Sequence, residues 1–147
     1  MEVWESAVRE LCCMPTLLWL ALQDKKYYGI KPLGVVLASL LLLCGGCFGK
    51  AGWQSRLGGV AVGIVVLMFA YFSKEAIGVA DGIIISVCGV AFGLYETVLL
   101  CFLAAVYAAG YAVVLLLLKK AGRKSRIPFL PFLLLGYVTM RIFVNSL

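Results

Sequence analysis

Long apolar runs, separated only by short polar linkers, restrict this chain to very few folds. Six such segments can be marked, at about residues 4–23, 32–48, 57–72, 80–93, 95–118 and 128–144. A helix needs roughly 20 apolar residues to cross a bilayer, and the segment at 80–93 is too short for that. We expect it to begin below the membrane surface, after irregular backbone that protein or a water-filled cavity surrounds.

Composition supports a membrane architecture. Hydrophobic residues make up 64% of the 147 residues, and the mean hydropathy is +1.07, whereas a soluble domain is typically about 45–50% apolar. A soluble fold of this size could not bury so much apolar surface. No polar stretch is long enough to form a second domain. The sequence therefore predicts an all-α, polytopic membrane protein, a single integral-membrane domain over 1–147 with about six transmembrane helices in one bundle.

The net charge of +6 comes from 13 Lys and Arg against 7 Asp and Glu. Most basic residues lie in short linkers between the apolar segments. This pattern is typical of cytoplasmic loops that face anionic lipid headgroups, and it does not indicate a nucleic-acid-binding protein. With six spans, one side would carry Lys25, Lys26, Lys31, Lys74, Lys119, Lys120, Arg123, Lys124 and Arg126, and the other Arg9, Lys50, Arg56 and Arg141. The positive-inside rule then places the first side in the cytoplasm and both termini outside.

Asp24 and Asp81 are the two aspartates of the chain. Asp24 ends the first apolar segment and Asp81 begins the fourth, so this topology puts both at the cytoplasmic face. Taken singly, Asp24 is typical of a solvated loop charge and Asp81 of a helix N-cap. Two carboxylates within hydrogen-bond reach, however, share a proton. Such a pair can hold a water, deprotonate it for attack on a peptide carbonyl and protonate the leaving amine, as in aspartic proteases.

Small residues form a regular pattern around Asp81. They recur every three or four positions, at Gly78, Gly82, Ser86, Gly89 and Gly93. On a helix they make one stripe, which lets a neighbouring backbone come close. We expect this stripe to fix the position of Asp81.

The six cysteines lie in or beside apolar segments, as is typical of free thiols that pack as small hydrophobes. The CGGC sequence at 44–47 is a single CxxC, and the chain has no histidine to complete a zinc site. We expect neither a metal nor another cofactor.

Three pieces of the chain resemble the type IV prepilin peptidases, membrane aspartyl proteases with a GxGD-type motif. DKKYYGIKP at 24–32 is similar to the family's first Asp with its following Pro-containing turn. IGVADGIIISVCGVAFG at 77–93 resembles the GxGD segment, and RIPFLPFLLLG at 126–136 resembles the opening of the last helix. The resemblance implies that Asp24 and Asp81 are the catalytic pair. It also implies that Gly78, Ala80 and Gly82 are the supporting motif positions.

The resemblance further implies an activity and a place. The family cleaves the basic leader from prepilins and pseudopilins at the cytoplasmic face of the bacterial membrane, so the expected partners are the leader, the apolar helix that follows it, and the bilayer. Ala80 stands where the family usually has glycine, and Ile84 where it often has lysine. These departures bear on efficiency and substrate choice. The chain lacks the cytoplasmic domain with paired CxxC motifs, so we expect peptidase without methyltransferase activity, as in the short form of Flp/Tad-type pilus systems.

Two other functions fit the residues. One is a small transporter that uses the aspartates as proton or cation sites, since intramembrane carboxylates commonly do so. Its weakness is that both aspartates sit at one face and that Glu96, at the far side, is expected to be alone. The other is a catalytically decayed pilus-assembly factor, which the changes at Ala80 and Ile84 leave open.

Overall fold

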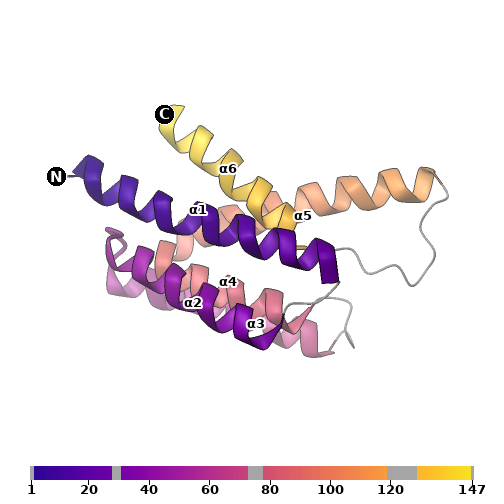
Figure 1. Ribbon diagram of the computed structural model, residues 1–147, viewed down its shortest axis with the longest axis horizontal. Coiled ribbons are helices and arrows are strands. Elements are labelled where there is room, and N and C mark those ends of the chain that lie inside the picture. The colour runs from indigo at the N-terminus through magenta and orange to yellow at the C-terminus, as the bar shows by residue number, and fades with distance from the viewer. Residues whose placement is uncertain (1, 28–30, 73–77, 119–128, 147) are drawn as a thin grey trace.

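The computed structural model describes residues 2–27, 31–72, 78–118 and 129–146 (Figure 1). Within these ranges the chain is all-helical. The helices are α1 (Glu2–Tyr27), α2 (Pro32–Cys47), α3 (Trp53–Phe72), α4 (Val79–Phe92), α5 (Leu94–Leu117) and α6 (Leu130–Ser146). Each begins and ends within a few residues of an apolar segment predicted from the sequence. The helical prediction is therefore confirmed.

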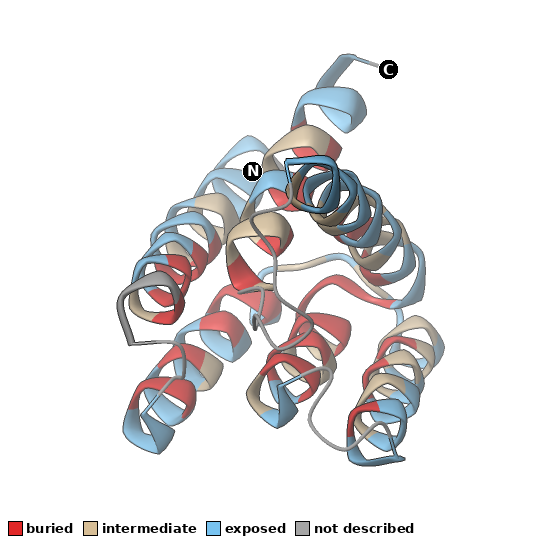
Figure 2. Cartoon of the chain, turned by 90° about the vertical axis from the view of Figure 1, so that its right-hand side faces the viewer, coloured by how far each residue is buried: buried red, intermediate tan, exposed pale blue. Residues whose placement is uncertain are grey.

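Helix α4 occupies the centre of the bundle. It packs against α2, α3 and α5, while α1 packs against α2 and α6. Viewed along the bundle, the buried faces of the helices turn toward one another and the exposed faces turn outward (Figure 2). The core is built from apolar side chains with almost no exposure. They include Leu17 and Leu20 of α1, Ile84, Ile85 and Cys88 of α4, Leu100 of α5, and Leu133 and Tyr137 of α6.

The spacing predicted a small-residue stripe that lets a neighbouring backbone come close, and in the structure Gly82, Ser86 and Gly89 of this stripe face α3. A Cβ atom built on Gly89 would overlap the backbone of Gly59, and one built on Gly63 would overlap Ser86. A Cβ atom on Gly82 would lie 2.7 Å from the Leu67 side chain. The two backbones approach this closely only because side chains are missing between them. The stripe therefore fixes α4, and with it Asp81, against α3.

Two of the described helices, α3 and α5, are long and apolar enough to cross a membrane. Helices α2, α4 and α6 are apolar but shorter, so the six-span bundle is not confirmed. Helix α4, with 14 residues, is about 21 Å long, which falls short of the roughly 30 Å hydrocarbon core as predicted. The irregular backbone expected before it falls at residues 73–77, outside the described residues.

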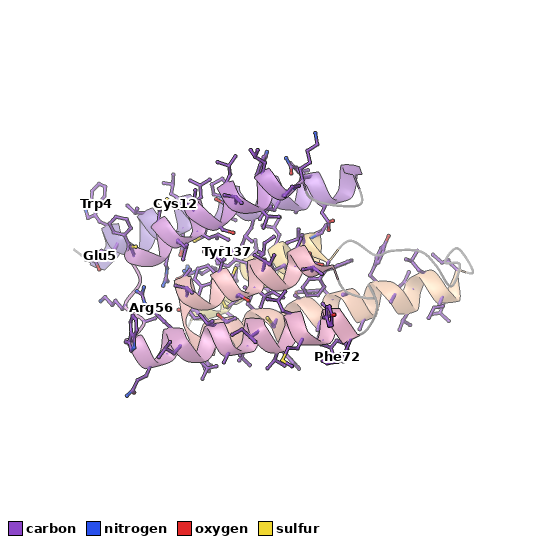
Figure 3. The ribbon with its side chains drawn as sticks, turned by 90° about the horizontal axis from the view of Figure 1, so that it is seen from below. Trp4, Glu5, Cys12, Arg56, Phe72 and Tyr137 are labelled. Carbon is purple, nitrogen blue, oxygen red and sulfur yellow. The ribbon has the colours of Figure 1, made fainter. Side chains whose placement is uncertain are left out.

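Arg56, near the start of α3, closes the turn that follows α2. Its guanidinium donates hydrogen bonds to the carbonyl oxygens of Gly46, Gly49 and Ala51, at 3.1, 2.9 and 3.0 Å. Cationic side chains satisfy helix C-terminal carbonyls and complement the helix dipole. Figure 3 shows Arg56 at the end of the bundle that also carries Glu5, with Phe72 at the other end.

Removing this cap is expected to destabilise the turn. We expect Arg56→Ala to lower the free energy of unfolding by about 1–2 kcal/mol, since three carbonyls lose a charged donor. Thermal unfolding in detergent measures the effect, with Gln54→Ala, an exposed neighbour in the same first turn, as the control. Equal melting temperatures for the two variants would contradict this assignment.

Candidate active site

Asp24 lies near the C-terminal end of its helix, whereas Asp81 lies near the N-terminal end of a different helix. Asp24 lies in the last turn of α1 and Asp81 in the first turn of α4. The fold brings these two helix ends to the same end of the bundle. Both aspartates are buried, with 9% and 8% of their surface exposed. Their role as a catalytic pair stays a prediction.

The backbone at Gly78 holds the Asp81 carboxylate. Gly78 is the N-cap of α4, and its carbonyl accepts a hydrogen bond from the Asp81 N–H at 3.1 Å. The Asp81 side chain turns back toward the backbone of Gly78. A Cβ atom on Gly78 would lie 3.2 Å from Asp81 Oδ2, so glycine leaves room for the carboxylate. Asp81 is thus not the N-cap itself but the third residue of α4.

The start of α6 supports Asp24. The Asp24 carboxylate faces the backbone of Leu130, and helix N-termini carry free N–H groups that favour anions. The second oxygen, Oδ2, is buried without a hydrogen-bond partner among the described residues. The sequence did not reveal Leu130 as a site residue. The signal was present in the proline-rich piece at 126–136, which begins the helix. Residues 126–128 of that piece lie outside the described residues.

The two departures from the motif have a simple structural explanation. Ala80 lies in the first turn of α4 with helical backbone, so its position needs no left-handed conformation and alanine fits without strain. Ile84 is fully buried in the hydrophobic core. Within the described residues a positive φ is found at Gly93, where α4 ends and α5 begins.

A second polar cluster, which the sequence did not predict, lies toward the opposite end of the bundle. Arg141 Nε lies 3.6 Å from Glu10 Oε1. The same Nε–H donates a hydrogen bond to the Tyr137 hydroxyl oxygen at 3.3 Å. Arg9 Nη1 lies 3.9 Å from Glu96 Oε1. Glu96 is therefore not alone, contrary to the sequence-based expectation. Figure 3 shows Tyr137 inside the bundle.

This cluster joins α1 to α5 and α6, and we expect it to be structural. Arg141→Met should lower the free energy of unfolding by about 2 kcal/mol or more, because Glu10 and the Tyr137 hydroxyl lose a charged donor in a largely buried site. Arg141→Lys keeps the charge and should recover part of the loss. Thermal melts of both variants in detergent test this, and identical melts for Arg141→Met and the parent would show that the cluster contributes nothing to stability.

Several sequence-based predictions concern residues outside those that the structure describes. Of the nine basic residues predicted for the cytoplasmic side, only Lys31 has a described side chain. The orientation in the membrane therefore stays a prediction.

The cysteines are free thiols, as predicted, with Cys13 and Cys88 buried in the core and Cys44 and Cys47 exposed on α2.

Comparison with protein families gives one match. The chain matches the type IV leader peptidase family over residues 11–113. This range includes both aspartates, all of α2, α3 and α4, and most of α1 and α5. Curated proteins and solved structures give no match. Since the matched range is well over half of the chain, and includes the two helix ends that carry the aspartates, this protein belongs to the type IV leader peptidase family.

Proposed function

We propose that this chain is a membrane aspartyl endopeptidase that cleaves the basic leader peptide from type IV prepilin-like or pseudopilin substrates. One observation carries the proposal. The two aspartates of the chain, 57 positions apart in the sequence, are both buried at helix ends that lie at the same end of the bundle in a member of a peptidase family.

The site supplies the groups that peptide hydrolysis requires. Two carboxylates that interact in a poorly hydrated site hold one proton between them. The ionised member takes a proton from a water, whose oxygen attacks the scissile carbonyl carbon. The other member donates its proton as the C–N bond breaks and the amine leaves. The two carboxylates lie beside the backbone at Gly78 and Leu130. Asp24 Oδ2 has no hydrogen-bond partner among the described residues, so it is an acceptor that a water could use.

Placement in a bilayer completes the proposal. The outward faces of α3 and α5 carry exposed apolar side chains such as Phe69 and Phe102, and a patch of that kind fits lipid better than water. In the proposed arrangement all the helices lie in the cytoplasmic membrane of a bacterium. The aspartates are near the cytoplasmic face, and both termini are outside.

The transporter reading has less support. A proton or cation path needs polar groups across the membrane, whereas Glu96 is paired with Arg9 and core side chains such as Ile84, Cys88 and Leu100 fill the centre of the bundle.

The test is co-expression with a panel of candidate prepilins from the same genome. We expect the parent chain to shorten at least one prepilin by its leader, as a gel shift and N-terminal sequencing would show. Asp81→Asn, expressed at the same membrane level, should leave that prepilin intact. A full panel left uncut by the parent would support the decayed assembly factor. Proton or cation flux that depends on Asp81, without cleavage, would support the transporter.

A further inference from the structure

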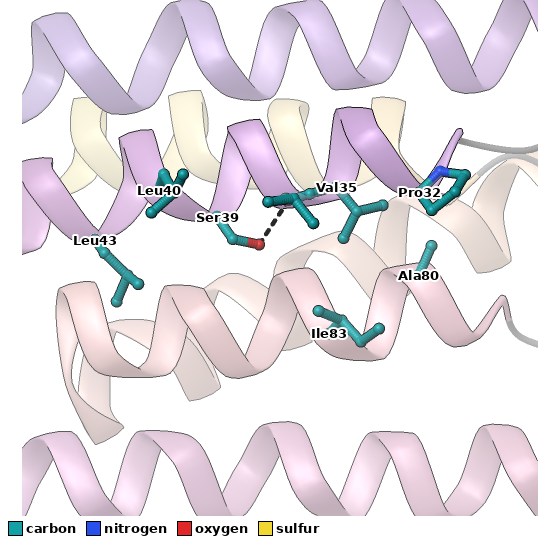
Figure 4. A pocket seen from close by; sticks show the side chains of 8 residues that line it. Pro32, Val35, Ser39, Leu40, Leu43, Ala80 and Ile83 are labelled. Carbon is teal, nitrogen blue, oxygen red and sulfur yellow. Dashed lines mark hydrogen bonds between the residues drawn. The ribbon is translucent and has the colours of Figure 1, made fainter.

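An apolar groove of about 500 Å³ runs between α2 and α4 (Figure 4). Its walls are mainly aliphatic. They include Pro32, Val36, Leu40 and Leu43 from α2 and Ala80 and Ile83 from α4.

One end of the groove lies beside the candidate active site. Ala80, which lines it, directly precedes Asp81 in the first turn of α4. Pro32, also in the wall, is the first residue of α2. From there the groove follows α2 as far as Leu43, a length of about 16 Å at 1.5 Å per residue. The groove therefore leads away from Asp81 along the helix axes.

The chemistry of the walls restricts the occupant. Among the described residues, no charged side chain lines the groove. The hydroxyl of Ser39, which does line it, already donates to the carbonyl oxygen of Val35 at 2.7 Å. Val36 and Leu40 are exposed, so the groove opens to the side, toward the lipid in the proposed arrangement. An occupant should be apolar and should gain little from hydrogen bonds.

We propose that this groove seats the apolar helix that follows the leader in the substrate, and that the Ala80 methyl group limits how closely this helix approaches Asp81. The inference rests on the proposed function, since a prepilin presents an apolar helix next to its cleavage point. With the scissile bond at Asp81, that helix must continue into the membrane along the enzyme. The groove begins beside Asp81 and runs in that direction, as in other helix-in-groove complexes.

The first test fills the groove at one position and leaves its neighbour as the control. Leu40 lines the groove and Leu41 does not, although both are exposed leucines of α2. We expect Leu40→Trp to lower the cleavage rate at limiting prepilin by about tenfold, in the range seen when a hydrophobic pocket is altered. Leu41→Trp should stay within about twofold of the parent. Melting temperatures of both proteins show whether either change affects folding instead.

The second test detects the substrate directly. A benzophenone amino acid at position 40 or 41, in the inactive Asp81→Asn chain, is irradiated in membranes that contain an uncleaved prepilin. We expect a prepilin adduct from position 40 and little from position 41. Equal adducts at both positions, adducts with lipid alone, or full activity of Leu40→Trp would overturn the groove proposal. The proposed function would still stand in each of these cases, provided that the parent chain cleaves the prepilin. Failure of the parent to cleave any prepilin would instead remove the basis of both.

The Ala80 part of the proposal has its own variant. Ala80→Gly removes the methyl group beside Asp81 and should raise the cleavage of prepilins with a bulky residue next to the scissile bond, relative to those with a small one. The same ratio in the parent and in Ala80→Gly would show that Ala80 does not determine specificity.

Discussion

Asp24→Asn and Asp81→Asn should each lower the rate of leader cleavage by about 100- to 10,000-fold, the usual contribution of a positioned acid or base. Each change removes one ionisable group from a pair that works only with one shared proton. The double variant should be no slower than either single variant, because groups that act as one unit are lost together. The rates of the two single variants and of the double variant are measured as leader removal in membranes that contain a prepilin cleaved by the parent chain.

The controls separate chemistry from folding. Asparagine has nearly the shape of aspartate, and both sites are buried, so the melting temperatures should stay close to that of the parent. Glu5→Gln makes the same chemical change at an exposed position of α1 near the opposite end of the bundle and should leave cleavage unchanged. If either aspartate variant folds normally and still cleaves at the parent's rate, the pair is not the catalytic centre.

The helices were predictable from the sequence because lipid leaves so few alternatives. Backbone polar groups in a bilayer must be satisfied within the segment, so apolar runs become helices. The prediction that Asp24 and Asp81 lie at the same membrane face came from the same reasoning. Asp24 follows the first predicted crossing and Asp81 the third, and segment ends that follow an odd number of crossings lie on the same side of the membrane.

Features that depend on distant partners were not predictable in this way. The sequence marked Gly89 as part of a packing stripe but did not show that Gly59 of α3 is its partner. Arg56 and Arg141 were counted only as charges that set orientation, yet Arg56 caps α2 and Arg141 binds Tyr137 and Glu10. Their partners become visible only when helices far apart in the chain are packed together.

The close contact between α3 and α4 at Gly59 and Gly89 should be highly sensitive to an added side chain. Gly89→Ala places a methyl group where the backbone of Gly59 lies, and neither backbone can move aside without separating α3 from α4. We expect the free energy of unfolding to fall by about 3 kcal/mol, at the upper end of typical overpacking costs. Thermal unfolding in detergent, compared with the parent chain, measures the loss.

Gly110→Ala is the matched control, since a Cβ atom there meets nothing within 4 Å and alanine favours a helix by about 0.5–1 kcal/mol over glycine. It should melt at or slightly above the parent's temperature. Because Gly89 and Asp81 lie on the same helix, a displaced α4 also moves Asp81 relative to Asp24, so Gly89→Ala should lower cleavage even below its melting temperature, and Gly110→Ala should not. Parent-like stability and cleavage in Gly89→Ala would mean that α3 and α4 are not held together by this contact.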